Sequence, residues 1–338
     1  MLRRAREVLA GKEAWVVGGA VRDELLGRPV VDLDIACRVP RHAAAAYARI
    51  GGGKPFPLSE RHGAWRVAHR DGRTVDFTPL PYGIHEDLAT RDFTINAIAR
   101  PLEGGADVDP FGGRAHLERR LISAVSDSVF ADDPLRLLRA VRFEQELGFE
   151  LDTTTEELVR ERAALVGRPA GERILAELEQ LGPVGYQRLD ALGLLEPLGG
   201  SLDRLPAEDA SRDLLLVAVF GRALERLPIS NERRRYARIL LRAELPADLS
   251  VRAVHRFRRA TEPWTLDALA LMGGSRELVD AVERARASDP PEPLVRGDEL
   301  GLPPGPQIGR ALELIEEERA AGTISTREEA LELVKGLA

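Results

Sequence analysis

Residues 16–36 of the chain read VVGGAVRDELLGRPVVDLDIA. Within this stretch, residues 30–36 predict a strand that carries two aspartates, Asp32 and Asp34. Because positions i and i+2 of a strand point to the same face, we expect the two carboxylates to lie side by side. Carboxylates so close repel each other unless a proton or a cation lies between them, and Mg²⁺ prefers oxygen ligands. The pair is therefore a candidate Mg²⁺ site, with a solvated pair at a strand edge as the alternative.

Two glycines precede this strand, between a predicted strand over residues 13–18 and a predicted helix over residues 20–27. Gly18 and Gly19 allow backbone N–H groups to approach a phosphate at the start of a helix, although a tight turn would also explain them. Arg22 follows on the same helix as a further candidate nucleotide contact. A strand, two glycines, a helix and an Asp-x-Asp strand in this order predict a triphosphate next to bound metal. Two metal ions bridged by the carboxylates would activate an attacking hydroxyl and neutralise a leaving pyrophosphate.

The composition is that of a soluble protein with more than one domain. The chain has 338 residues, of which 44% are hydrophobic and 30% charged, and its formal net charge is −7. This charge argues against unspecific coating of nucleic acid but allows a local basic groove. A single cysteine, Cys37, excludes a disulfide framework. No apolar run is long enough to span a membrane and no signal peptide is recognisable, so we expect a cytoplasmic protein without a membrane partner.

The secondary-structure pattern changes near residue 115. Before it, strands and helices alternate, and residues 64–69 and 73–78 predict a β-hairpin. Asp76 on that hairpin is either a third carboxylate for the metal site or an exposed strand aspartate. After residue 115, helical spacing dominates, so we expect an α+β head followed by an all-helical body. The predicted helices of the body cover residues 116–120, 132–147, 153–164, 170–181, 184–193, 207–226, 230–242, 249–260, 264–272, 275–286, 306–320 and 325–336.

A second candidate group lies in residues 90–99, which read TRDFTINAIA. We expect a helix over residues 87–100, which would place Asp92 and Asn96 one turn apart on the same face, next to Arg91. Such a face offers hydrogen-bonding groups for a ribose and phosphates. The alternative, which this stretch favours when taken alone, is a helix cap with a surface ion pair.

Residues 132–143, which read DDPLRLLRAVRF, form the third candidate group. They predict the start of a helix over residues 132–147, on which Arg136, Arg139 and Arg142 recur every three positions. A solvated basic face would explain such a series. However, leucine, alanine and valine fill much of the rest of the helix. The helix is therefore amphipathic, and its polar side carries arginines where a solvated helix would carry charges of both signs.

Asp133 and Arg136 form a pair suited to recognising a nucleobase. A carboxylate accepts a hydrogen bond and a guanidinium donates one. Cytosine and adenine present an amino donor beside a ring-nitrogen acceptor, whereas guanine and uracil present the reverse. Each mismatched group would cost about 1–3 kcal/mol when buried. One Asp/Arg pair therefore can select C and A without a nucleic-acid template.

In this order the motifs resemble those of the class II tRNA nucleotidyltransferases, which share their catalytic core with bacterial poly(A) polymerases. The stretches that carry the resemblance are residues 18–34, 91–97, 109–112 and 132–143, together with Glu172, Arg173 and Glu177. The last three residues resemble a helix-stabilising motif of the family. The remaining chain, beyond residue 182, is similar to the family's helical parts more weakly.

The resemblance implies a polymerase-β-like nucleotidyltransferase head followed by a helical neck, body and tail. We expect these parts at residues 1–115, 116–183, 184–265 and 266–338. It also implies that the helical parts bind the acceptor end and T arm of tRNA. The cofactor implied is Mg²⁺ and the nucleotide substrate is CTP, with ATP as a second substrate in some members.

The resemblance also assigns roles to the residues singled out above. The implied catalytic and metal-binding residues are Asp32 and Asp34. The implied nucleotide-binding residues are Gly18, Gly19, Arg22, Arg91, Asp92, Asn96, Asp133, Arg136, Arg139 and Arg142. Among these, Asp92 is expected at the ribose and Arg91 at the triphosphate, and Asp133 and Arg136 are expected at the base.

Three departures from the family pattern bear on which nucleotides are added. Asp132 stands where members usually have Glu, and Thr90 stands where they usually have Arg. Only residues 77–90 separate Asp76 from Arg91, where full CCA-adding members carry a longer flexible loop. A short linker cannot move base-recognising residues between two geometries. We therefore expect CC addition, with the terminal A added by a separate enzyme.

Other functions stay open from the sequence alone. Full CCA addition is the main alternative. Poly(A) polymerase activity is disfavoured, because the extra basic run that such members carry after the first motif is missing. A catalytically silent RNA-binding protein would show the same order of motifs, but the intact Asp32 and Asp34 argue against it.

Overall fold

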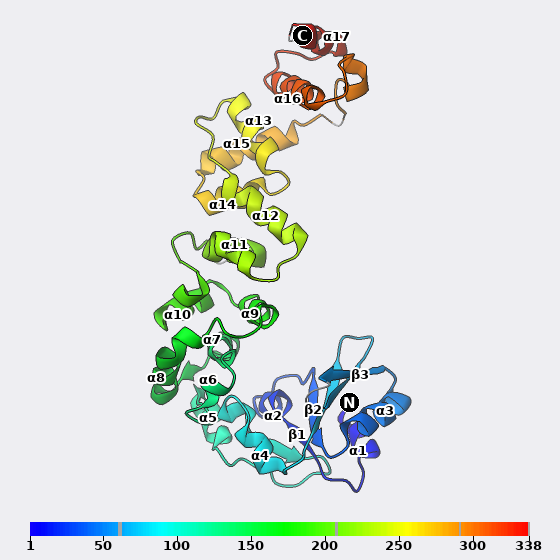
Figure 1. Ribbon diagram of the computed structural model, residues 1–338, viewed down its shortest axis with the longest axis vertical. Coiled ribbons are helices and arrows are strands. Elements are labelled where there is room, and N and C mark those ends of the chain that lie inside the picture. The colour runs from blue at the N-terminus through cyan, green and yellow to red at the C-terminus, as the bar shows by residue number, and fades with distance from the viewer. Residues whose placement is uncertain (60–62, 207–208, 291, 337–338) are drawn as a thin grey trace. The chain divides into compact units, whose positions relative to one another are not determined.

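The computed structural model describes residues 1–59, 63–206, 209–290 and 292–336 (Figure 1). The chain divides into two compact units, residues 1–198 and 199–338. Among the described residues, every strand belongs to the first unit, and the second unit is helical. This matches the predicted class of an α+β head followed by helices. The finer division into neck, body and tail stays a prediction.

One six-stranded sheet forms the head of the first unit and is drawn in blue and cyan in Figure 1. Its strands are β1 (Ala14–Val17), β2 (Leu33–Cys37), β3 (Lys54–Ser59), β4 (Ala64–Ala68), β5 (Thr74–Pro79) and β6 (Ala99–Pro101). Their order is β3-β4-β5-β2-β1-β6. The predicted hairpin is present as β4 and β5, and β5 runs parallel to β2. This register sets Asp34 of β2 directly opposite Asp76 of β5.

The edge strand β3 is absent from the sequence-based prediction. Pro55 and Pro57 lower the strand propensity of its sequence, and three glycines precede it. The strand pairs with β4 alone. At an edge, proline is tolerated where its missing N–H would have faced solvent. Phe56 and Leu58 of this strand remain exposed.

The connection between β5 and Arg91 belongs to the core of the head. The helices of the head are α1 (Leu2–Val8), α2 (Gly19–Leu25), α3 (Pro40–Gly51) and α4 (Ile84–Ala89). Leu80, Ile84 and Leu88 lie in the connection and are at most 6% exposed. They pack in one cluster with Val17 of β1 and other buried residues of the sheet. The segment is thus a packed part of the domain.

The predicted helix over residues 87–100 is wrong. Helix α4 ends early, and a short 3₁₀ turn and strand β6 follow it. The N–H of Thr94 donates to the carbonyl oxygen of Ser123 at 2.8 Å, and the carbonyl oxygen of Asp92 accepts from the N–H of Val125 at 3.2 Å. These tertiary hydrogen bonds use the backbone groups that a continuous helix would need.

Helices of the first unit continue after the head and are drawn in cyan and green in Figure 1. They are α5 (Gly113–Arg119), α6 (Val129–Asp132), α7 (Arg136–Leu147), α8 (Thr153–Arg162), α9 (Gly171–Leu178) and α10 (Pro183–Ala191), with a short parallel pair of strands, β7 (Leu121–Ile122) and β8 (Glu150–Leu151). Helix α7 begins at Arg136, not at residue 132 as predicted. Asp133 has an extended backbone instead, because the following proline disfavours a helical conformation at that position.

The second unit contains the helices predicted from apolar periodicity, most of them with boundaries that differ by at most two residues. They are α11 (Arg212–Phe220), α12 (Asn231–Arg242), α13 (Val251–Thr261), α14 (Thr265–Met272), α15 (Arg276–Ala287), α16 (Pro306–Ala320) and α17 (Arg327–Lys335). The helix predicted over residues 207–226 starts partly outside the described residues, and its α-helical part ends at Phe220, where a 3₁₀ stretch follows. The side chains of Ser230 and Thr326 cap α12 and α17 by accepting hydrogen bonds from backbone N–H groups. Within the described part of the chain, no helix has the length and apolarity needed to cross a membrane.

Candidate active site

All predicted site residues line one cavity of the first unit, with a volume of about 610 Å³. They come from the start of α2, from β2 and the residue before it, from the segment after α4, and from α7 and the turn before it. The predicted residues on its wall are Gly18, Gly19, Arg22, Asp32, Asp34, Arg91, Asp92, Asn96, Asp133, Arg136, Arg139 and Arg142. The fold therefore brings the separate motifs together, while the role of each residue stays a prediction.

Asp32 and Asp34 form the acidic side of this cavity. Asp32 directly precedes β2, and its Oδ1 accepts hydrogen bonds from the N–H and the hydroxyl of Thr74 at 3.1 and 2.8 Å. Burial raises the pKa of Asp34 to about 6; the charge of Arg91 opposes this rise, and the charges of Asp76 and Asp32 add to it. A cation between these carboxylates would relieve their repulsion.

Asp76 lies directly opposite Asp34 in the sheet, but it is not the exposed strand aspartate of the alternative interpretation. It is only 8% exposed, and its two oxygens accept hydrogen bonds from Arg66, each at 2.7 Å. The interpretation as an exposed strand aspartate is therefore wrong. The described residues contain no cluster of three or more His, Cys, Asp or Glu side chains that could hold a metal ion. Asp32 and Asp34 thus offer two carboxylates, which suits Mg²⁺ because this ion keeps water and phosphate oxygens in its other positions.

Gly18 fits closely against the acidic side. It is the N-cap residue of α2 and has a positive φ of 70°. A Cβ atom at this position would lie 3.2 Å from Oδ2 of Asp34 and 3.4 Å from Nη1 of Arg91. Any larger residue would therefore be strained and would crowd the carboxylate.

Asp92 is the buried centre of a polar network. Its Oδ1 accepts from the N–H of Phe93 at 2.8 Å and from Nδ2 of Asn96 at 3.0 Å. Its Oδ2 accepts from Nε and Nη2 of Arg139 at 2.8 and 2.6 Å. Burial raises the pKa of Asp92, but the charge of Arg139 and these hydrogen bonds outweigh it and hold the pKa below its usual range. Asn96 in turn accepts from Nη1 of Arg22 at 3.0 Å, so the predicted contact between Asp92 and Asn96 exists without the predicted helix.

Phe143 joins the arginines of this network and was not among the predicted site residues. The guanidinium groups of Arg22, Arg139 and Arg142 lie 5.2, 5.1 and 4.2 Å from the centroid of its ring. Attraction between cations and the ring face holds these like charges close together. Arg142 also donates through Nε to Oε2 of Glu177 in α9 at 2.6 Å. An aromatic residue directly after an arginine series was the available sequence signal.

Asp133 and Arg136, the predicted base-recognising pair, are held by different partners. The Nη2 of Arg173 in α9 donates to Oδ2 of Asp133 at 2.7 Å. Arg136 donates to the carbonyl oxygens of Thr90 and Val129 at 2.6 and 3.3 Å. Arg173 lines the cavity as well. The sequence motif indicated only a helix-stabilising role for Arg173, so its position at the site was missed.

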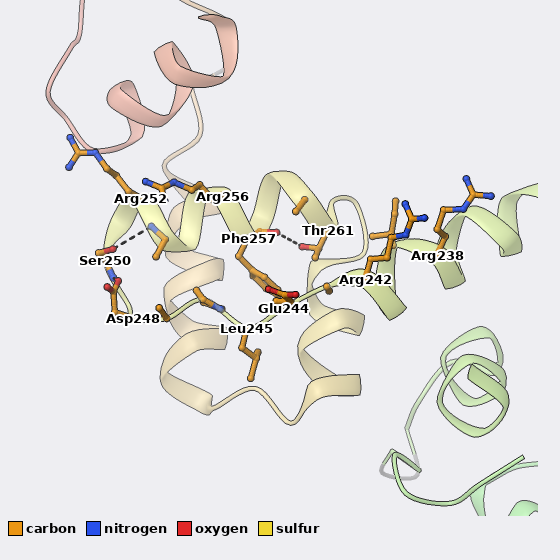
Figure 2. Close-up of a pocket in the computed structure, with 16 residues that line it drawn as sticks. Arg238, Arg242, Glu244, Leu245, Asp248, Ser250, Arg252, Arg256, Phe257 and Thr261 are labelled. Atoms are coloured by element: carbon orange, nitrogen blue, oxygen red, sulfur yellow. Dashed lines mark hydrogen bonds between the residues drawn. The ribbon is translucent and has the colours of Figure 1, made fainter. Parts of the chain in front are cut away.

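A second cavity, of about 820 Å³, lies between α12 and α13 in the second unit (Figure 2). Arg238 and Arg242 of α12 line it. Arg252 and Arg256 of α13 also line it, but they form ion pairs with two glutamates of α16 at 2.8 and 2.6 Å. This cavity lacks the paired strand carboxylates of the first, so we place the candidate active site in the first unit.

The chain is similar to known tRNA nucleotidyltransferases over most of its length. A family model described as the Poly A polymerase head domain matches residues 14–51 and 60–123. The chain is 35% identical to the A-adding tRNA nucleotidyltransferase of Deinococcus radiodurans, with 95% of each chain covered. It is 34% identical to the CC-adding tRNA nucleotidyltransferase of Geobacter sulfurreducens, with 95% of this chain and 91% of the relative covered. The chain belongs to the class II tRNA nucleotidyltransferases.

A solved structure of a tRNA nucleotidyltransferase has the same fold. The Bacillus stearothermophilus CCA-adding enzyme in complex with CTP is 26% identical, with a TM-score of 0.75 and 99% of this chain and 97% of that chain covered. The predicted fold and the predicted enzyme class are both confirmed, and the alternative of a catalytically silent RNA-binding protein does not hold. The tRNA nucleotidyltransferases named here are A-adding, CC-adding and CCA-adding, so membership alone leaves open which nucleotides are added.

Proposed function

We propose that this tRNA nucleotidyltransferase adds two cytidines to the 3′ end of tRNA from CTP and leaves the terminal adenosine to a separate enzyme. The observation that carries the proposal is the short, packed connection between β5 and Arg91. Its residues Leu80, Ile84 and Leu88 are buried in the head core. A segment packed in this way lacks the freedom of a long surface loop.

Arg136 forms a hydrogen bond to the same connection. Its Nη2 donates to the carbonyl oxygen of Thr90, the C-cap residue of α4, at 2.6 Å. The side chain proposed to donate to the base is thus tied to a packed helix end. A change from cytosine to adenine geometry would need α4 to move or this hydrogen bond to break. Because this hydrogen bond restrains Arg136, we infer that the site selects a single base, cytosine.

Asp32 and Asp34 are the residues proposed to hold Mg²⁺. Such an ion neutralises charge on the triphosphate and lowers the pKa of a hydroxyl bound to it. The 3′ hydroxyl of tRNA attacks the α-phosphate of CTP, so that a phosphodiester forms and pyrophosphate leaves. The positive φ and small size of Gly18 keep the space beside Asp34 open for the phosphates.

Asp133 and Arg136 are proposed to recognise cytosine. The carboxylate accepts from the N4 amino group and the guanidinium donates to N3. Uracil would present a carbonyl to Asp133 and an N–H to Arg136, so that like groups face each other. The network of Asp92, Asn96 and Arg139 lies beside this pair in the cavity and is proposed to position the ribose.

Product length on tRNA that lacks its last three nucleotides tests the proposal. With CTP alone, the expected product is longer by two nucleotides. ATP alone is expected to give no extension, and CTP with ATP is expected to give no third nucleotide. Addition of a third nucleotide when both are present would replace CC addition by full CCA addition.

A-adding activity is the second candidate, because the Deinococcus radiodurans relative with 35% identity carries that name. A tRNA that already ends in CC separates the two activities. Extension of this tRNA by one nucleotide with ATP, together with no use of CTP on the shorter tRNA, would establish A addition instead. Our proposal expects the reverse in both reactions.

A further inference from the structure

The carboxylate of Asp133 is already contacted by several protein donors. Arg173 donates through Nη2 to Oδ2 at 2.7 Å and through Nη1 to Oδ1 at 3.3 Å. The N–H of Leu135 donates to Oδ1 at 3.2 Å. A carboxylate offers about four lone-pair positions, so these donors occupy all but one of them. The remaining position is on Oδ2.

We propose that Arg173 is a positioning residue for nucleotide selection, which fixes the plane of the Asp133 carboxylate and leaves one acceptor position for the amino group of the base. The inference rests on the proposed role of Asp133 in recognising cytosine. Arg173, which lies on α9, would hold the Asp133 carboxylate in the orientation that this role needs. A planar guanidinium fork suits this task because it holds both carboxylate oxygens at once.

Arg173 is itself held in place through its own helix. Glu177 lies four residues further along α9, on the same helical face. It accepts from Nε of Arg142 in α7 at 2.6 Å and lies 3.7 Å from Nη1 of Arg139. These contacts fix the Arg173 face of α9 against α7. Arg173 therefore contacts the Asp133 carboxylate from a helix that is itself held against α7.

The same contact favours the ionised form of the Asp133 carboxylate. Burial raises the pKa of Asp133, but the hydrogen bond and charge of Arg173 outweigh it, together with the N–H of Leu135 and the charge of Arg136. The pKa therefore lies below its usual range. An ionised carboxylate only accepts hydrogen bonds, whereas a protonated one would also donate to the O4 carbonyl of uracil. Arg173 thus favours cytosine through both direction and charge.

Kinetics with CTP and UTP in the full-length protein test the proposal. In Arg173→Met, the ratio of kcat/KM for CTP to that for UTP is expected to fall about tenfold or more, because the carboxylate loses its fixed orientation. The ratio in this variant is also expected to fall further as the pH is lowered, while the wild-type ratio changes less. Arg173→Lys keeps the charge but loses the fork, so its ratio is expected to fall as well.

Arg160→Met is the matched control. Arg160 is similarly exposed, at 49% against 52% for Arg173, and pairs with Glu156 on its own helix. It does not line the cavity, so its replacement is expected to leave the CTP/UTP ratio unchanged. A ratio that stays at the wild-type value in Arg173→Met would show that Arg173 only supports the packing of α9. A wild-type ratio in Arg173→Lys would overturn the claim that the fork matters.

Asp133→Asn separates this inference from the proposed function. A lower ratio in Asp133→Asn with an unchanged ratio in Arg173→Met would defeat the role of Arg173 alone. An unchanged ratio in Asp133→Asn would defeat both roles. If Arg173 acts through Asp133, the double variant Asp133→Asn with Arg173→Met loses no more discrimination than Asp133→Asn does.

Discussion

At the scale of single residues, three aspartates on or beside neighbouring strands have different partners. Asp32 accepts a hydrogen bond from Thr74, and Asp76 accepts one from Arg66. For Asp34, burial is the main influence and raises its pKa. The oxygens of Asp76 are occupied by a cation of the protein itself. Asp34, with a raised pKa, is the carboxylate whose charge most needs an external cation.

Asp34→Asn is therefore expected to lower the incorporation of labelled CTP into tRNA by about 100-fold or more, because the charge is lost with little change of shape. Asp76→Asn is the contrast: it weakens the pair with Arg66 but removes no proposed metal ligand. Incorporation by the folded Asp76→Asn protein is expected to exceed that of Asp34→Asn clearly. Equal losses in the two variants would contradict the assignment of the metal ligands.

Asp92→Asn is expected to lower the free energy of unfolding by about 3 kcal/mol, because it leaves the guanidinium of Arg139 without its main buried partner. The carboxylate is 7% exposed and accepts two hydrogen bonds from Arg139. Urea unfolding followed by circular dichroism measures the change. Asp71→Asn, in an exposed turn pair with Arg73, serves as the control and is expected to show no measurable loss.

The stability difference between wild type and Asp92→Asn should depend on pH. Because the pKa of Asp92 is lowered in the folded state, its contribution is fully present above the unfolded pKa of about 3.9. It is lost as the pH falls through the lower, folded pKa. Urea unfolding at pH 6, 4 and 3 should therefore show a shrinking difference below pH 4. A constant difference down to pH 3 would mean that the pair does not lower this pKa.

At the scale of elements, the start of α5 is placed by close contact with the segment that carries Asp92. A Cβ atom on Gly113 would lie 2.2 Å from the carbonyl oxygen of Thr94. Gly113→Ala is therefore expected to destabilise the first unit by about 3 kcal/mol in urea unfolding. Gly309→Ala, in α16 with no heavy atom within 4 Å of the added carbon, is expected to stabilise its helix by up to about 1 kcal/mol.

Elements were predictable where local sequence decided them. Helix α12 follows from its apolar spacing and from Ser230 as its cap, and β2 follows from its alternation. The segment around Asp92 was predicted wrongly because its backbone bonds to residues 123–125, which lie far away in sequence. Strand β3 was missed because its two prolines lower the strand propensity of its sequence, although proline is tolerated in an edge strand.

The candidate site was predictable as a set of residues but not as a set of contacts. Each motif has a recognisable local pattern, and the fold then gathers the motifs into one cavity. The partners of Asp76 and Asp133 are Arg66 and Arg173, which come from other elements. No spacing rule connects Asp133 with Arg173, and the pair of Asp76 with Arg66 depends on the exact register of the hairpin, in which the two residues lie directly opposite each other. The clustering around Phe143 likewise requires Arg22 of α2 to reach the ring of Phe143 in α7.

At the scale of the whole molecule, the cavity belongs to one unit only. All predicted site residues lie within residues 1–198, which form a compact unit with its own core. A fragment of residues 1–198 is therefore expected to fold and to bind CTP with an affinity close to that of the full chain. Isothermal titration calorimetry measures this, with Asp133→Asn in the fragment as a control for binding at the proposed site. Loss of CTP binding in a folded fragment would mean that the second unit contributes to the site.

The prolines of β3 have a consequence for how copies of the protein behave in concentrated solution. An open sheet edge with exposed Phe56 and Leu58 would normally invite another chain to add a strand. Pro55 and Pro57 alternate with these residues, so that two of the outward backbone positions have no hydrogen to donate. The border of the sheet thus resists intermolecular strand growth while its apolar side chains remain in contact with water.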